Sequence, residues 1–394
     1  MRKIFFWLHL TAGSIAGLVI LIMSATGVLL TYEKQMIQWA EARSAEIEPG
    51  ANRQPVSQLL QTTVGNTAAS PASITIRRAA ASPAEIALGP GKSVLVNPYT
   101  GAAAGEGAPN LRVFFRKVTL WHRWLGSQEG SRGWQKQVTG ACNFAFVFLG
   151  FSGLYMWWPR RWTPAARRTA FVPQAGRSGK ARDFNWHNAL GFWASVPIIV
   201  IAGTATVMSY PWANNLVYQI AGEKPPAPRR EGAPAEQRGG VGAPRGGEGR
   251  QARAFTTDGL DAIWQRAAAT NRNWQTISMR FQGPRVSIHV DGGYGGQPQK
   301  RETLTFNRAG ELLEREGFAS LTPGRRARNY MRFLHTGEVW GLTGQTIAGL
   351  TSLIGVVLVW TGISLALRRL WAWNKRRNSP VRTAVEAEKT LTTA

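Results

Sequence analysis

Cysteine is almost absent from this sequence of 394 residues, which contains only Cys142. A single cysteine excludes an internal disulfide and a cysteine-rich zinc or iron–sulfur site. It also excludes a haem attached through a C-x-x-C-H motif, because that motif needs two cysteines. Acidic residues are scarce as well: 22 Asp and Glu stand against 47 Lys and Arg, so the formal net charge is +25. The position of these charges then decides between a nucleic acid, an anionic membrane and an acidic substrate as the partner.

Four long stretches contain no Asp, Glu, Lys or Arg: Ile4 to Tyr32, Val138 to Pro159, Phe184 to Gly222, and Val339 to Leu367. Each reaches the roughly 20 apolar residues that a helix needs to cross about 30 Å of hydrocarbon. We therefore predict four transmembrane helices. In the third stretch, Pro211 and the two asparagines that follow predict a helix end near Tyr210. The first stretch also fits a cleaved signal peptide, although it is long for one.

Lys and Arg in short flanking segments predict the orientation of the spans. They gather between the second and third stretches and after the fourth. These residues are Arg160, Arg161, Arg167, Arg168, Arg177, Lys180, Arg182, Arg368, Arg369, Lys375, Arg376, Arg377, Arg382 and Lys389. We expect both segments and the N-terminus to face the cytoplasm, and the segments of about 33–137 and 211–338 to lie outside. Because this topology explains much of the positive charge, we predict no nucleic-acid partner.

A weak internal repeat divides the chain into two halves. After the first and third stretches, a helical pattern precedes strand-like segments in which apolar and polar residues alternate. The helical patterns cover Pro55–Val64 and Thr257–Ala269, and the strand-like segments are Ser73–Arg77, Ser93–Asn97, Thr276–Arg280, Arg285–Val290 and Thr303–Asn307. Each half thus predicts one exterior α+β module, followed by an aromatic, basic segment that leads into the next span. A Pro/Gly/Arg-rich insertion from Glu223 to Arg253 is interpreted as a flexible linker.

Four of the five histidines occupy matched positions in the two halves. His9 and His187 lie near the cytoplasmic ends of the first and third spans, whereas His122 and His335 precede the second and fourth spans at their outer ends. An ionisable side chain at membrane depth is a functional candidate, and imidazole is an axial ligand of haem iron. One helical turn after three of these histidines come glycines that would leave room for a porphyrin ring, namely Gly13, Gly126 and Gly191. We predict two bis-histidine haem sites, His9 with His187 and His122 with His335.

The same residues also fit simpler interpretations. A histidine in an interfacial helix is commonly a hydrogen-bonded polar residue, and small residues in membrane helices also allow close packing. His289 alternates with Ile288 and Val290 in a predicted strand, which favours packing over a substrate contact. Cys142 is interpreted as a small apolar core residue.

The segments around the four histidines resemble those of the PepSY-associated transmembrane family, which includes inner-membrane ferric-siderophore reductases. The resemblance covers nearly the whole chain and rests on Trp7–Leu10 with Gly13, Trp121–Gly126, Asn185–Gly191 and Leu334–Glu338. It implies an integral membrane α-helical protein of the bacterial inner membrane, with four helices and two α+β PepSY-like periplasmic modules. It also implies two b-type haems held by His9, His122, His187 and His335, and electron transfer to ferric siderophores or other ferric chelates.

These predictions divide the chain into eleven segments. They are transmembrane helix 1 (4–32), module 1 (33–110), a first histidine segment (111–137), transmembrane helix 2 (138–159), a basic cytoplasmic loop (160–183), transmembrane helix 3 (184–210), a connection with the linker (211–254), module 2 (255–324), a second histidine segment (325–341), transmembrane helix 4 (342–367) and a basic cytoplasmic tail (368–394).

The electron donor is expected to be a separate quinol or cytoplasmic reductase, because the sequence contains no nucleotide-binding motif. Basic residues around His122 and His335 would attract anionic chelates or haem propionates, and equally the phosphates of membrane lipids. Two other functions fit the sequence. One is a sensor or regulator in which the histidines are structural. The other is a metal transporter, for which the spans lack the usual carboxylates, thiolates and methionine clusters.

Overall fold

The computed structural model describes residues 1–67, 70–89, 92–127, 133–159, 161–226, 255–294 and 296–377. These residues form two compact units. The membrane unit contains residues 1–31, 118–210 and the described part of 346–394, and the sheet unit contains the described parts of 32–117 and 211–345. The predicted linker lies outside the described residues from residue 227 onward, as do Arg160 and the tail from residue 378.

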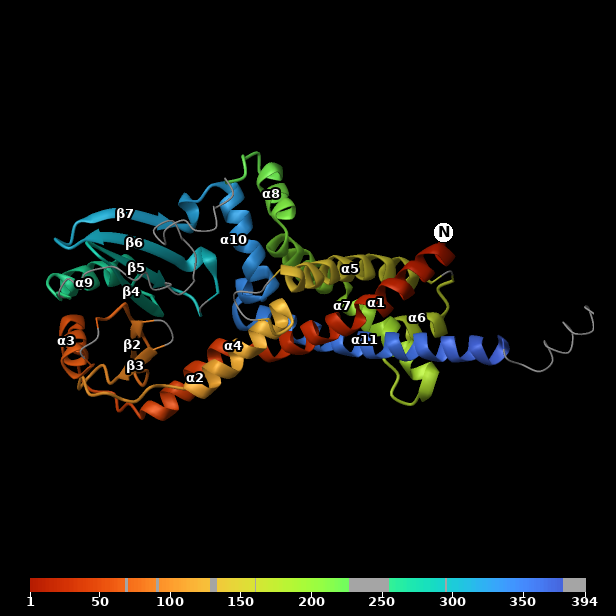
Figure 1. Ribbon diagram of the computed structural model, residues 1–394, viewed down its shortest axis with the longest axis horizontal. Coiled ribbons are helices and arrows are strands. Elements are labelled where there is room, and N and C mark those ends of the chain that lie inside the picture. Colours follow the sequence, from red (N-terminus) through yellow and green to blue (C-terminus); the bar gives the residue numbers. More distant parts are fainter. Residues whose placement is uncertain are drawn as a thin grey trace, which may run out of the picture. The chain divides into compact units, whose positions relative to one another are not determined.

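Four long apolar helices confirm the four predicted spans: α1 (Arg2–Leu30), α5 (Gly133–Trp157), α7 (Gly179–Ser209) and α11 (Gly341–Arg377) (Figure 1). Each is long and apolar enough to cross a membrane. Helix α7 ends where the sequence predicts, since Tyr210 is extended and Pro211 begins the next helix, α8 (Pro211–Ile220). The direction of the spans through the membrane stays a prediction.

The helices of the membrane unit pack through small residues. Helix α5 packs along both α1 and α7. A Cβ atom on Gly150 of α5 would lie only 2.7 Å from Cγ1 of Ile199 in α7, and one on Gly17 of α1 would lie 3.4 Å from Cδ1 of Ile363 in α11. Small residues allow backbones to approach closely in lipid, where packing rather than hydrophobic burial holds helices together. The short helix α6 (Pro164–Phe171) is capped by Thr163, whose side chain accepts a hydrogen bond from a backbone N–H.

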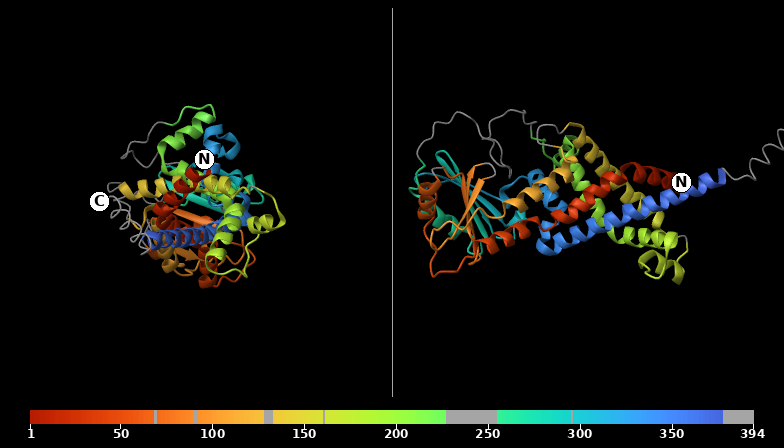
Figure 2. Two further views of the ribbon diagram at one scale, coloured as in Figure 1. Left: turned by 90° about the vertical axis from the view of Figure 1, so that its right-hand side faces the viewer. Right: turned by 60° about the horizontal axis from the view of Figure 1, so that its bottom comes forward.

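Strands from both predicted modules form one antiparallel sheet, with seven strands among the described residues in the order β3-β2-β1-β4-β5-β6-β7 (Figure 2). Five of them match predicted segments: β1 (Ser73–Arg77), β3 (Lys92–Val96), β4 (Thr276–Gln282), β5 (Arg285–Asp291) and β6 (Arg301–Asn307). The sequence does not predict β2 (Ala84–Gly89) or β7 (Leu312–Gly317). The two halves join through β1 and β4, which pair from Ser73 with Arg280 to Arg77 with Thr276. The predicted modules therefore share one sheet.

One face of the sheet is covered by α3 (Val56–Thr67) and α9 (Leu260–Thr270), which correspond to the two predicted helical patterns. Buried side chains from these helices and from strands of both halves form a single core. They include Leu59, Leu60, Ile74, Ile86, Leu260, Ile263, Ile277, Met279, Ile288 and Leu304. Because burying one such side chain contributes about 1.5–3 kcal/mol, the shared core stabilises the joined sheet.

A buried charge network connects further helices to the sheet. Glu41 of α2 (Glu33–Ala45) is fully buried and accepts hydrogen bonds from Arg112 of α4 (Pro109–Trp124). Arg77 of β1 lies 3.4 Å from Glu41 and 3.5 Å from Glu85 of β2, and Glu85 lies 2.7 Å from Arg112. Burial alone would lower the pKa of Arg112, but Glu85 and Glu41 outweigh this effect and raise it. Two carboxylates and two guanidinium groups therefore neutralise one another inside the sheet unit.

The chain segments before the second and fourth spans are helical. Helix α4 carries His122, and α10 (Pro323–His335) ends with His335. Helix α10 begins after Thr322, whose side chain accepts from the backbone N–H of Arg325. Short 3₁₀ turns follow strand β5, strand β7 and α10, at Pro298–Lys300, Phe318–Ser320 and Glu338–Trp340.

Candidate functional site

The membrane unit brings together His9 of α1 and His187 of α7, which are far apart in the sequence. Their ring centroids lie 6.3 Å apart, and the ring planes make an angle of 83°. Both side chains are half-buried. The sequence places the two histidines at matched depths, and the helix packing makes them direct neighbours.

Each of these imidazoles is held by a hydroxyl group on a neighbouring helix. Nδ1 of His9 lies 2.8 Å from Oγ of Ser152 in α5, and Nδ1 of His187 lies 3.0 Å from Oγ1 of Thr361 in α11. Both hydroxyls also lie 2.7 Å from a backbone carbonyl four residues earlier, at Phe148 and Val357. A hydroxyl has a single hydrogen. Because the carbonyl can only accept, the hydroxyl donates to it and accepts from Nδ1–H, so Nε2 is assigned the lone pair.

The separation of the two ring centroids equals that expected for two imidazoles that bind one iron ion. A metal–imidazole bond of about 2 Å on each side, plus about 1 Å from each nitrogen to its ring centre, places the centroids about 6 Å apart. The observed separation of 6.3 Å agrees with that value. Among the described residues, no group of three or more His, Cys, Asp or Glu side chains could hold a metal ion. Two imidazoles suit haem, because the porphyrin supplies the remaining ligands.

Polar groups next to His187 add to this fit. Nε1 of Trp186 is buried without a hydrogen-bond partner among the described residues, and a buried donor of this kind needs an acceptor. One turn before His187, Asp183 is almost fully buried and accepts from Ser364 Oγ at 2.7 Å. Arg182 and Arg368 lie 2.9 and 3.5 Å from the same carboxylate. Arg182 and Arg368 carry two positive charges and Asp183 carries one negative charge, so the cluster has a net charge of +1. This charge would complement a haem propionate.

The glycines predicted to make room for a ring do not border the imidazoles in this arrangement. A Cβ atom on Gly13 would meet Leu149 at 3.8 Å and one on Gly191 would meet Leu358 at 3.6 Å, both ordinary contacts. Gly126 has a φ of +82°, and a Cβ atom there would lie 2.9 Å from Trp121, so Gly126 permits the chain to turn at the end of α4. The predicted contribution of these three glycines to a haem site stays a prediction.

Other glycines lie directly against the imidazoles. A Cβ atom on Gly153 would lie 3.4 Å from Cε1 of His9, and one on Gly362 would lie 3.2 Å from Cε1 of His187. Each of these glycines follows the residue whose hydroxyl binds the same histidine. These Ser/Thr-Gly pairs were not predicted from the sequence. Their signal is weak, since Thr139-Gly140 and Thr343-Gly344 occur in the same helices.

The predicted outer pair is divided between the two units. His122 belongs to the membrane unit, and its Nδ1 lies 3.0 Å from Oγ1 of Thr26 in α1. Thr26 in turn donates to the carbonyl of Ile22 at 2.6 Å. His335 belongs to the sheet unit, where it is half-buried at the end of α10. The pairing of His122 with His335 therefore stays a prediction.

The two remaining candidate residues have structural surroundings. His289 of β5 points away from the hydrophobic core, and its Nδ1 lies 3.0 Å from Oγ1 of Thr303. Burial, together with Arg280 and Arg301, lowers the pKa of His289 to about 4, so its imidazole is neutral at neutral pH. Cys142 is buried in a small apolar cluster with Ala16 and Ile20, which agrees with its interpretation as a core residue.

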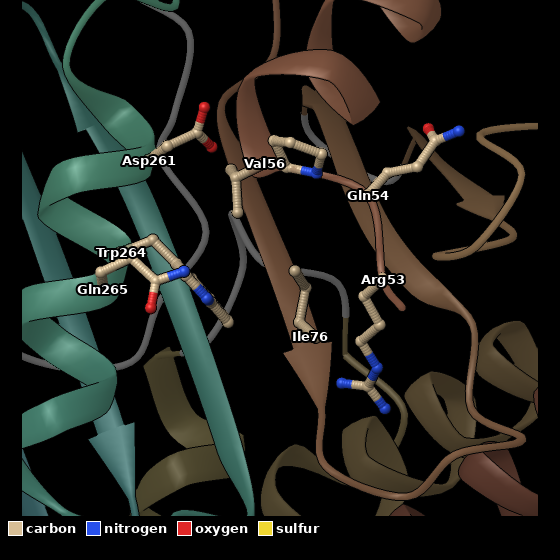
Figure 3. A pocket seen from close by; sticks show the side chains of 8 residues that line it. Arg53, Gln54, Val56, Ile76, Asp261, Trp264 and Gln265 are labelled. Atoms are coloured by element: carbon tan, nitrogen blue, oxygen red, sulfur yellow. The ribbon is translucent and has the colours of Figure 1, made fainter. Parts of the chain in front are cut away.

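A pocket of about 270 Å³ lies in the sheet unit between the first turn of α3 and helix α9 (Figure 3). Its charged groups are engaged in structural contacts. The carboxylate of Asp261 accepts hydrogen bonds from the backbone N–H and the hydroxyl of Ser57. The guanidinium of Arg53 donates to the backbone carbonyls of Arg77 and Arg78 at 2.8 and 3.0 Å. The bonds between Ser57 and Asp261 connect the two halves of the sheet unit, whereas those of Arg53 lie within the first half.

A chain with four apolar spans and a separate sheet unit is a multi-pass membrane protein. Residues 6–369 match the family described as the PepSY-associated TM region, so the chain belongs to that family. The match confirms the family resemblance. No curated protein matches the sequence. The ferric-siderophore reductase activity implied by the resemblance stays a proposal.

Proposed function

We propose that this protein is a haem-dependent membrane oxidoreductase of the bacterial inner membrane that transfers electrons to ferric chelates in the periplasm. The observation that carries the proposal is the pair formed by His9 and His187, with a centroid separation of 6.3 Å and both Nδ1 atoms held by hydroxyls. Membership of a membrane family supports the location within a bilayer.

The residues of the membrane unit would hold and orient the cofactor. His9 and His187 would hold the haem iron through Nε2, while Ser152 and Thr361 would keep the imidazoles from rotating away. The packed helices α1, α5, α7 and α11 would exclude water from the site. When bound, a b-type haem supplies one-electron redox chemistry, which amino-acid side chains lack.

The complete proposal includes a second haem with His122 and His335 as ligands, on the outer side. Electrons would enter near His9 and His187 from a separate quinol or cytoplasmic reductase and leave near the outer pair. A ferric siderophore or another ferric chelate is the proposed acceptor. Its reduction to Fe(II) releases the iron more easily, because Fe(II) binds hard oxygen ligands less tightly than Fe(III).

The alternative function is a membrane sensor or regulator without redox activity. The observation that favours it is the pocket in the sheet unit, whose walls include Gln54, Ile76 and Trp264 besides the engaged charged groups. In that case the histidines would be structural, and their replacement would leave activity intact.

Absorption spectra of the detergent-purified protein separate the two functions. We expect a Soret band, reduction by dithionite, and two b-type haems per chain in a pyridine haemochrome assay. His9→Ala and His187→Ala should each lower the count towards one, whereas His289→Ala, a histidine of the sheet unit, should leave it unchanged. A wild-type protein without a Soret band after expression with ample haem would reject the proposal and favour the regulator.

A further inference from the structure

All three histidines of the membrane unit have the same kind of partner. In each case Nδ1 lies within hydrogen-bond distance of a hydroxyl, and the next residue is a glycine against Cε1 of the same ring. The three sets are His9 with Ser152-Gly153, His187 with Thr361-Gly362, and His122 with Thr26-Gly27, where a Cβ atom on Gly27 would lie 3.5 Å from Cε1. We call each Ser/Thr-Gly dipeptide a hydroxyl–glycine pair.

We propose that the hydroxyl–glycine pairs are positioning residues that fix the tautomer and the orientation of haem-ligating histidines. This inference rests on the proposed function. The hydroxyls of Ser152, Thr361 and Thr26 each donate to the carbonyl four residues earlier, at 2.7, 2.7 and 2.6 Å. They therefore accept from Nδ1–H, which leaves the basic lone pair on Nε2. Hydrogen bonds of this type orient a ligating imidazole and increase its basicity.

The glycines of the pairs at His9 and His187 contribute a steric restriction. A Cβ atom on Gly362 would lie 3.2 Å from Cε1 of His187, and one on Gly153 would lie 3.4 Å from Cε1 of His9. The Gly362 distance is tighter than an ordinary van der Waals contact and the Gly153 distance is at its lower limit, so a larger residue at either position would press the ring away from its hydroxyl partner. The hydroxyl sets the direction of the ring, and the glycine allows the ring to approach closely.

A hydroxyl partner differs from a carboxylate partner in its effect on the imidazole. The hydroxyl is neutral and draws the Nδ1 proton only weakly, so the imidazole keeps its proton when it binds iron. The increase in ligand basicity is then moderate. Since a basic ligand stabilises Fe(III) more than Fe(II), loss of the hydroxyl should raise the midpoint potential of the haem that it serves.

The test replaces Thr361 by Val, which keeps the shape of the side chain and removes the hydroxyl. The matched control is Thr351→Val on the same helix, because Thr351 is buried and bonds its own i−4 carbonyl at 2.7 Å without a histidine. We expect Thr361→Val to lower the affinity for haem by about 10- to 100-fold, the usual effect of removing such a partner, which would appear as faster haem loss to excess apomyoglobin. Its midpoint potential should rise, and Thr361→Ser should restore both values.

Ser152→Ala and Thr26→Val serve as independent variants in case Thr361→Val folds poorly. Thr26→Val should affect only the haem that His122 binds, which would be visible as a change in one of two potentials. If the wild type contains haem and all three variants match Thr351→Val in haem loss and potential, the positioning role is wrong while the proposed function stands. A wild type without haem rejects both.

Discussion

The buried charge network of the sheet unit allows a stability prediction with a defined magnitude. Glu41 is fully buried, and together with Glu85 it balances the charges of Arg77 and Arg112. Glu41→Gln keeps the shape of the side chain but leaves two guanidinium groups facing one carboxylate. Removing one partner of a buried ion pair costs about 3–5 kcal/mol. Since Glu85 remains, we expect the lower end of that range, about 3 kcal/mol.

Thermal unfolding of the full-length protein in detergent measures this effect. For a unit of 150–250 residues, a loss of about 3 kcal/mol lowers Tm by about 6–12 °C. The control is Glu302→Gln, because Glu302 pairs with Arg315, whose side chain is 54% exposed, and such a solvent-accessible pair should contribute less than about 1 kcal/mol. The double variant Glu41→Gln with Arg77→Gln restores neutrality. Its loss of stability should therefore be smaller than the sum of the losses in the two single variants. Equal Tm values for Glu41→Gln and Glu302→Gln would refute the reasoning.

Two further predictions concern the sheet unit. The pKa of His289 is lowered from the ordinary value of 6.5 to about 4 in the folded protein, so between these pH values the unfolded chain binds a proton that the folded chain does not. The free energy of unfolding should therefore fall by up to about 3 kcal/mol as the pH decreases from 6.5 to 4. His289→Gln should flatten this part of a curve of unfolding free energy against pH, and an unchanged slope would contradict the assignment. Gly337 has a φ of +73°, and a Cβ atom there would lie 2.1 Å from the carbonyl oxygen of Gly344. Gly337→Ala should therefore lower the free energy of unfolding by more than the roughly 1–2 kcal/mol that a left-handed alanine costs. The control is Gly283→Ala, which should lose only that amount, because Gly283 has a φ of +63° and no atom lies within 4 Å of the new Cβ. Equal losses in chemical denaturation would show that the close approach to Gly344 is relieved without cost.

Elements with strong local signals were predictable from the sequence. The four spans are recognised because each is a continuous run without charged residues, and this property needs no knowledge of neighbours. Strands such as β1 and β5 alternate apolar and polar residues and were predictable for the same reason. Strand β7 lacks this signal, since its residues Leu312 to Arg315 are all exposed. Strand β2 contains alanines and a glycine, which have low strand propensity.

The joining of the two predicted modules depended on tertiary structure. Strand β1 pairs with β4, although about 200 residues of chain separate them. The sequence of either strand would equally suit an unpaired strand at the edge of a sheet. What decides the pairing is the common core under α3 and α9, where residues of both halves are buried together. Burial of this kind is a property of the assembled sheet, so the sequence of a single strand does not show which strand it pairs with.

The candidate site shows the same division. The sequence by itself determined that His9 and His187 lie in spans at matched depth, because position within an apolar run sets depth. Only the tertiary structure decided that their rings lie 6.3 Å apart and that Ser152 and Thr361 hold them. The reason is physical: helix periodicity shows which residues share a face, but contacts between faces depend on how small residues such as Gly150 and Gly362 let the helices approach.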